Sequence, residues 1–131
     1  MPYKMIKARY MHVRQLMNLF VKITILLLLV CIGSYYLYFY ITPNVTVVNK
    51  SENVISNVNV SLLNSNLNFG TIELEQENTI YYSLSQSDGS YNYSFSIDRK
   101  IISGSCGYIT NNEFNKRFVI TVSESNQVAC N

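Results

Sequence analysis

Residues 91–97 have the sequence YNYSFSI, in which aromatic or aliphatic side chains alternate with polar ones. Successive side chains of a strand point to opposite faces of a sheet, so this pattern predicts a strand with one face against a core. The same alternation occurs in NVNVSL (57–62). In FVITV (118–122), Phe118, Ile120 and Val122 alternate with Val119 and Thr121. No stretch after residue 43 has the periodicity of an amphipathic helix. This part of the chain is therefore expected to consist of strands.

Shorter strand candidates lie between and beyond these three stretches. They are Val45–Val48, Leu67–Leu74, Thr79–Leu84, Cys106–Thr110 and Gln127–Cys130. Turn-forming residues separate them, among them Asp88-Gly89, Asp98-Arg99-Lys100, Asn111-Asn112 and Glu124-Ser125-Asn126. About eight short strands in about ninety residues predict an all-β domain over residues 42–131, a small antiparallel β-sandwich of immunoglobulin-like or transthyretin-like type.

An uncharged segment, ITILLLLVCIGSYYLYFYI (23–41), precedes this domain. In helical form its length is about 28 Å, close to the roughly 30 Å of a bilayer's hydrocarbon core. Lipid offers no partner for bare backbone groups, so the segment is predicted to cross the membrane as one helix that acts as a signal anchor. Side chains suited to the membrane interface flank it, namely Lys22 on one side and Tyr35, Tyr36, Tyr38 and Tyr40 on the other.

The distribution of charge predicts the orientation of this helix. Residues 1–42 contain five basic and no acidic residues, whereas residues 43–131 contain five basic and eight acidic residues, a net charge of −3. By the positive-inside rule, residues 1–22 form a cytoplasmic basic tail, and the domain lies in the periplasm of a bacterial inner membrane. Membrane lipid is then a partner, while so few charges do not favour nucleic-acid binding.

Three alternatives for the N-terminal part stay open. A cleaved signal peptide has small residues before its cut, a place that Cys31 and Gly33 could fill, but its apolar run is shorter than this one. Cys31 could instead carry a lipid, although the residue before a lipidated cysteine is usually small and here is Val30. Residues 1–20 could lie as an amphipathic helix on anionic lipid, rather than serve as a tail that sets topology.

The two cysteines of the predicted domain, Cys106 and Cys130, are expected to form a disulfide bond. They would lie in an oxidising compartment, and a domain this small needs a further source of stability. The bond would close a loop of about 25 residues, for which the chain-entropy model gives about 3 kcal/mol. A redox or zinc site is disfavoured, because no Cys-x-x-Cys motif is present. Gly104 and Gly107 are expected to permit a bulge or close packing.

The predicted domain offers few groups for catalysis. It contains no histidine, which removes the commonest general base, the Ser-His and Cys-His pairs and most zinc sites. Its glycines are scattered, so no phosphate-binding loop is present. We therefore expect no catalytic residue, no cofactor, no metal and no small-molecule substrate. A hydrolase that uses two carboxylates is the enzymatic alternative left open.

Two sets of side chains are candidates for a partner surface. Glu73, Glu75 and Glu77 are spaced by two and would share one face of a strand, as an acidic strip for a cation or a basic partner. The alternative is a solvated face that runs into a turn, because exposed carboxylates need no partner. Tyr81, Tyr82, Tyr91 and Tyr93 could form a stacking surface for a polysaccharide or protein ligand. The alternative is that one ring of each pair faces the core.

The motif Asn-x-Ser/Thr, a glycan acceptor in eukaryotic secreted chains, begins at Asn44, Asn49, Asn59 and Asn92. Asparagine and serine are abundant throughout the segment, which favours chance matches in an AT-rich bacterial genome.

Four stretches of the outer segment carry a resemblance: NKSENVISNVNV (49–60), FGTIELEQENTIYY (69–82), DGSYNYSFSI (88–97) and CGYITNNEFNKRFVITV (106–122). They resemble small bacterial envelope proteins with one N-terminal hydrophobic segment and one short β-domain. In that arrangement an Asn-x-Ser opening precedes a Gly-x-Ile strand and turn, followed by a late Gly-Tyr-Ile/Val strand. Where the usual turn has Pro-Gly-Glu, this chain has Glu75-Gln76-Glu77. The resemblance implies a fold and a location, and no functional residue.

Together these features favour a non-enzymatic, membrane-tethered binding module that presents sheet edges and loops to an unidentified periplasmic or envelope protein. An immunity protein that neutralises a toxin and a subunit of an envelope complex both fit this description. The alternative is a structural subunit that acts through its transmembrane helix, in which Gly33-Ser34 would let a second helix approach closely.

Overall fold

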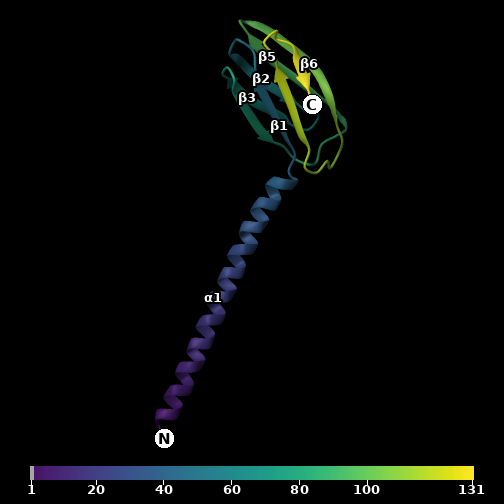
Figure 1. Ribbon diagram of the computed structural model, residues 1–131. Helices are drawn as coiled ribbons and strands as arrows, with labels where there is room; N and C mark the ends of the chain where they lie inside the picture. Colours follow the sequence, from purple (N-terminus) through teal and green to yellow (C-terminus); the bar gives the residue numbers. More distant parts are fainter. Residues whose placement is uncertain (1) are drawn as a thin grey trace. The chain divides into compact units, whose positions relative to one another are not determined.

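The computed structural model describes the backbone of residues 2–131 and the side chains from residue 12 onward. It consists of one helix, α1 (Pro2–Ile41), followed by eight strands (Figure 1). The chain divides between Tyr40 and Ile41 into two compact units, the helix and a β-domain, and each is described by itself.

α1 is longer than the segment that the sequence predicts to cross the membrane. Its 40 residues extend the helix back to Pro2, so the described part of the basic tail is helical as well. Within α1, His12–Ile41 is long and apolar enough to span a bilayer, and none of its most apolar window is buried. By length and composition, α1 therefore fits a membrane anchor or a signal sequence.

The β-domain consists of two four-stranded sheets with the core between them (Figure 1). The first sheet contains, in spatial order, β4 (Glu77–Tyr81), β1 (Asn44–Asn49), β7 (Arg117–Val122) and β8 (Val128–Cys130). The second contains β3 (Asn66–Ile72), β2 (Ile55–Ser61), β5 (Gly89–Ile97) and β6 (Lys100–Ile109). The predicted fold class, one N-terminal apolar helix followed by a small β-sandwich, is confirmed.

One strand pair departs from the expected antiparallel arrangement. β1 and β7 are parallel, with Val45 opposite Phe118 and Val47 opposite Ile120, whereas the other pairs are antiparallel. β1 and β7 are far apart in sequence, so no hairpin turn imposes opposite directions on them. Both strands begin at the same end of the sandwich, and alternate side chains of each strand pack in the same core.

The strand that contains Cys106 begins earlier than the sequence predicts. β6 starts at Lys100 and pairs with β5 through a hairpin in which only Asp98 and Arg99 form the turn. Both turn residues have positive φ, 50° and 66°, as the type I′ turn of a tight hairpin requires. Neither residue is the glycine that usually marks such a turn, so the sequence does not reveal how closely β6 follows β5.

The core confirms the alternation seen in the sequence. Tyr91, Phe95 and Ile97 of β5 are buried, as are Val58 and Val60 of β2. In β2 the pairing register shifts on either side of Val58, next to Asn57, whose φ is 52°. This bulge inserts an extra residue, so that side chains three positions apart can point into the same core.

The two ends of the sandwich differ in the loops that they carry. The proximal end, where β1 begins, holds the loops of residues 62–65, 82–88 and 110–116. The distal end, where β1 finishes, holds residues 50–54, 73–76, 98–99 and 123–127. The chain enters the domain at the proximal end through Thr42 and Pro43.

Candidate functional site

The predicted acidic strip is divided between a turn and a strand. β3 ends at Ile72, so Glu73 and Glu75 lie in the turn that crosses to the other sheet, where Glu75 has a φ of 58°. Glu77 is the first residue of β4. The three carboxylates are exposed at the distal end. The expectation that they share one strand face is therefore wrong, because the chain turns before the strand can continue through them.

β4 nevertheless places two of the predicted partner residues on one face. Glu77 and Tyr81 are four positions apart in this edge strand, on the same face as Thr79. The Thr79 hydroxyl lies 2.7 Å from that of Thr46 on β1, which shows that this face points away from the core. The guanidinium carbon of Arg117 lies 5.9 Å from the centroid of the Tyr81 ring, and the Tyr81 side chain is exposed.

Tyr91 does not belong to any surface. Its side chain is 0% exposed, and its ring stacks on Phe118 with 3.9 Å between centroids and 8° between planes. Its hydroxyl lies 2.8 Å from that of Tyr82, the residue after β4. A stacking surface that includes Tyr91 is thus excluded, since the alternation of β5 directs this ring into the core.

The outer edge of β6 is the longest strand edge that the structure leaves unpaired. β6 has ten residues, and within residues 44–131 it pairs only with β5. Ile101, on this strand, is 71% exposed. Beside it, Ile97, Ile102 and Ser125 help to line a surface hollow of about 460 Å³ at the distal end. The sequence patterns do not identify this edge, although the apolar pair Ile101-Ile102 directly after the turn is a signal for it.

The disulfide bond joins two edge strands of opposite sheets. Cys106 on β6 and Cys130 on β8 are bonded, with their Cα atoms 6.3 Å apart. The prediction of this pairing is confirmed. The bond connects the two sheets on the side of the sandwich where β6 and β8 lie, at a point in the last third of β6.

The two glycines beside Cys106 act as expected. A Cβ atom at Gly104 would overlap the hydroxyl of Tyr93, and one at Gly107 would overlap the ring of Phe118. Gly107 has a φ of 65° and lies where the β5–β6 register shifts. These positions allow close packing and a bulge, and they carry no reactive group.

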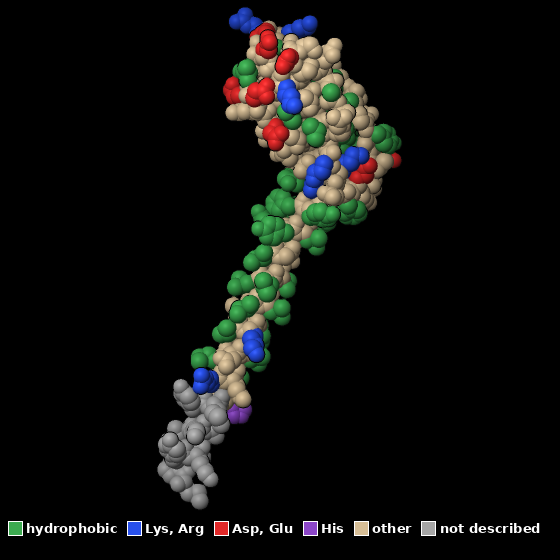
Figure 2. Space-filling view, viewed as in Figure 1, with side chains coloured by type: hydrophobic (Ala, Val, Ile, Leu, Met, Phe, Trp, Pro, Cys, Tyr) green, Lys and Arg blue, Asp and Glu red, His purple; other side chains and the backbone are tan. Residues whose placement is uncertain are grey.

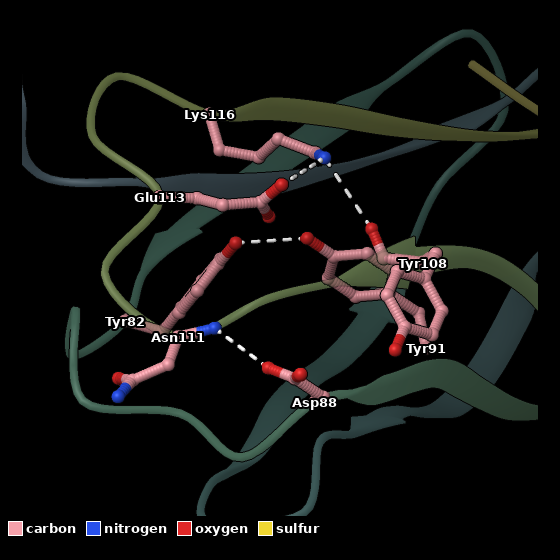
Figure 3. A network of polar contacts seen from close by, with 7 residues as sticks. All are labelled: Tyr82, Asp88, Tyr91, Tyr108, Asn111, Glu113 and Lys116. Atoms are coloured by element: carbon pink, nitrogen blue, oxygen red, sulfur yellow. Dashed lines mark hydrogen bonds and ion pairs between the residues drawn. The ribbon is translucent and has the colours of Figure 1, made fainter.

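A polar network connects the loops at the proximal end (Figure 3). Lys116 Nζ lies 3.0 Å from Glu113 Oε1 and donates a hydrogen bond to the carbonyl oxygen of Tyr108 at 3.3 Å. The backbone N–H of Asn111 donates to Asp88 Oδ1 at 3.0 Å. Both carboxylates therefore hold loops together, which is a structural role.

The pKa shifts in this network follow from burial and hydrogen bonding. Loss of water contact, with the shared hydrogen bond adding to it, raises the pKa of Tyr82 far above its ordinary value. Burial likewise raises the pKa of Tyr91. For Glu113 partial burial acts upward, but hydrogen bonds from Lys116 and Thr110 outweigh it and lower the pKa. The described residues contain no cluster of three or more His, Cys, Asp or Glu side chains that could hold a metal ion.

The predicted membrane-interface residues lie along α1. Lys22, Tyr35, Tyr36, Tyr38 and Tyr40 are exposed, as residues that contact headgroups would be. The alternative lipid attachment site, Cys31, is a free and exposed cysteine on the same helix. Contact of these tyrosines with headgroups stays a prediction.

By its architecture, this protein belongs to the chains in which an apolar helix precedes a disulfide-linked β-sandwich. No family model matches the chain, and no curated protein matches it. Among solved structures, the NMR structure of a protein from Eubacterium rectale is similar in fold, with a TM-score of 0.50. The likeness covers 69% of this chain and 86% of that one, at 11% sequence identity. It shows a shared fold with a bacterial protein and carries no functional residue.

Proposed function

We propose that this protein is a non-enzymatic binding module, held by α1 at the periplasmic face of a bacterial inner membrane, that receives an extended segment of an envelope protein along the outer edge of β6. The observation that carries this proposal is the length of that unpaired edge. Typical strands have about five or six residues, and proteins usually shorten, charge or cover the edges of their sheets.

The geometry of β6 suits the addition of a strand. In a two-residue hairpin the residues beside the turn bond to each other, so Lys100 points its backbone groups toward β5. Ile101, Ser103 and Ser105 then point theirs outward, where a partner strand could pair with them. The exposed Ile101 and the adjacent hollow would receive side chains of that strand and add specificity.

The other elements of the proposal come from the chain itself. An apolar helix and a disulfide bond in the domain support a tether and an oxidising compartment. The domain contains no histidine, and its Asp88 and Glu113 carboxylates accept hydrogen bonds that hold loops. An immunity protein and an envelope-complex subunit are the two roles that this description accommodates.

The test is photo-crosslinking in intact cells, with the full-length chain and a crosslinking residue at Ser105. We expect a reproducible envelope protein to be captured, and Ile101→Lys to abolish capture, because a lysine on an edge strand opposes pairing. Leu74→Lys is the matched control, since Leu74 is also an exposed apolar residue but lies in a turn. Equal loss in both variants, or no capture, would contradict the proposal.

Two further experiments test the tether and the competing hypothesis. A reporter enzyme that is active only outside the cytoplasm, fused after Asn131, should be active. Replacement of residues 23–41 by an unrelated spanning helix should preserve capture if the β-domain binds the partner. Loss of capture would instead indicate a structural subunit that acts through its helix.

A further inference from the structure

The exposed aromatic residues of the β-domain gather at one end. Within residues 44–131 they are Tyr81, Tyr108 and Phe114, which are 42%, 58% and 64% exposed. Tyr81 ends β4, Tyr108 lies next to the last residue of β6, and Phe114 lies in the loop before β7. All three therefore belong to the proximal end. Single exposed apolar side chains are ordinary, and the aliphatic residues Val54, Leu74 and Ile101 are exposed at the distal end. The exposed rings, in contrast, are confined to the proximal end.

Charge is distributed in the opposite way. The distal end carries Lys50, Glu52, Glu73, Glu75, Glu77, Asp98, Arg99, Lys100 and Glu124, a net charge of −3. The proximal end carries Asp88, Glu113, Lys116 and Arg117, which sum to zero. Figure 2 shows the acidic side chains mainly at the upper end of the domain. An anionic bilayer would repel the distal end and tolerate the proximal one.

The loop that carries Phe114 is bonded to the residues that follow the apolar segment. The backbone N–H of Asn115 donates to the carbonyl oxygen of Ile41 at 2.8 Å, and Arg117 Nη1 donates to that of Thr42 at 2.6 Å. Ile41 and Thr42 belong to the same compact unit as these loops. Ile41 is also the last residue of the apolar stretch. If that stretch spans the bilayer, the Phe114 loop lies at the level of the headgroups.

We infer that the proximal end of the domain is a lipid-contacting surface, formed by Phe114, Tyr108 and Tyr81, that rests in the phospholipid headgroup layer. Aromatic rings favour this layer, where their apolar parts leave water and their polar groups remain hydrated. Contact there would restrain the domain on the membrane and leave the distal end, with the hollow beside β6, facing the periplasm. The inference depends on the proposed membrane tether.

The test uses tryptophan as a depth probe, since the chain has no tryptophan of its own. Three single variants, Phe114→Trp, Ile101→Trp and Leu29→Trp, are prepared in the full-length chain and reconstituted in phosphatidylcholine nanodiscs. Ile101 is the matched control, because it is about as exposed as Phe114 but lies at the distal end. Leu29 reports on the apolar stretch itself. Fluorescence is then measured with and without lipids brominated near the headgroup or deep in the chain.

The inference predicts that shallow brominated lipid reduces the emission of Phe114→Trp about two-fold or more, because an interfacial indole lies within contact of such lipid. Ile101→Trp should be unaffected, and Leu29→Trp should be quenched by deeply brominated lipid. Quenching of Leu29→Trp without quenching of Phe114→Trp would overturn the inference and leave the tether intact. Absence of quenching in all three would overturn the tether and the inference together, and equal quenching at Phe114 and Ile101 would overturn the inference.

Discussion

At the scale of single residues, Tyr82 and Tyr91 illustrate how the core accommodates polar atoms. Their hydroxyl groups lie 2.8 Å apart, and each side chain is almost wholly buried. A buried hydroxyl without a partner costs about 1–3 kcal/mol, whereas a hydrogen bond that is made contributes about 0.5–1.5 kcal/mol to stability. Burial raises the pKa of both groups, so the pair remains protonated and its contribution to stability is lost only as the pH rises above about 10.

We predict that the two hydroxyls are energetically coupled. Tyr82→Phe and Tyr91→Phe should each lower the free energy of unfolding by about 1–2 kcal/mol, because each leaves the other hydroxyl unpaired. The double variant should cost less than the sum of the two, as expected for groups in contact. A double-mutant cycle by urea denaturation measures this coupling. Additive losses would show that the two hydroxyls do not interact.

Glu113 gives a pH dependence with a defined sign. Its folded pKa lies below the ordinary value of 4.5, so the carboxylate stabilises the fold at neutral pH. This contribution should be lost as the pH falls below about 4.5 toward the folded pKa. Glu113→Gln should therefore lower the melting temperature at pH 7 and differ little from the wild type at acid pH. Glu52→Gln, an exposed carboxylate in the loop before β2, serves as the control and should change neither value.

Asn49 shows a role that no local pattern reveals. Its side chain is 0% exposed, and its Nδ2 donates to the carbonyl oxygens of Asn53, Ile72 and Glu73. Its Oδ1 accepts from the N–H and the hydroxyl of Ser51. Asn49 thus satisfies backbone groups of two loops, and it cannot act as the glycan acceptor that its Asn-x-Ser motif permits.

At the scale of elements, the β5–β6 turn is formed by residues that do not favour it. Arg99 has a φ of 66°, which costs a residue with a Cβ atom about 1–2 kcal/mol relative to its ordinary backbone conformation. Glycine adopts this conformation without that cost but loses more entropy on folding. The positive φ values persist because the ladder on either side, from Ile97 opposite Lys100 to Phe95 opposite Ile102, determines the loop length.

We predict that Arg99→Gly stabilises the domain by about 0.5–1 kcal/mol. The change removes the cost of the left-handed conformation at Arg99, which exceeds the additional conformational entropy that glycine loses on folding. Ser103→Gly is the matched control, because it places glycine in the adjacent strand β6 at a position without a positive φ and should destabilise. Thermal melting followed by circular dichroism distinguishes the two. A lower melting temperature for Arg99→Gly would contradict this account of the turn.

At the scale of the whole molecule, the disulfide bond completes the sandwich on one side. On the other side the chain itself crosses between the sheets through the β3–β4 turn. On the β6–β8 side the Cys106–Cys130 bond is the covalent link, and β8 has only three residues to hold it in place. The bond therefore retains a short terminal strand as well as closing a loop.

We predict that removal of this bond costs about 3 kcal/mol, the value of the chain-entropy model for a loop of this length. In a domain of this size that loss corresponds to a decrease of about 10 °C or more in melting temperature. Cys106→Ser combined with Cys130→Ser is compared with the oxidised and the reduced wild type. A melting temperature equal to that of the oxidised protein would show that β8 needs no covalent support.

The sequence by itself determined the classes of element and their order. Residues 91–97 and residues 57–62 form strands because side-chain alternation is a local property, and the apolar run of residues 23–41 forms a helix for a similar reason. The disulfide partners followed because the domain has two cysteines. The strands and the helix depend on neighbours along the chain, which the sequence displays directly, and the disulfide pairing depends only on how many cysteines the domain has.

Only the tertiary structure decided how these elements meet. The parallel β1–β7 pair, the burial of Tyr91, the end of β3 at Ile72 and the gathering of Tyr81, Tyr108 and Phe114 at one end all depend on residues far apart in sequence. Each results from packing two sheets over one core, where the position of one strand limits every other. Both proposed surfaces arise at this level. The β6 edge depends on which strand remains at the margin of its sheet, and the proximal end depends on which loops and strand ends meet there.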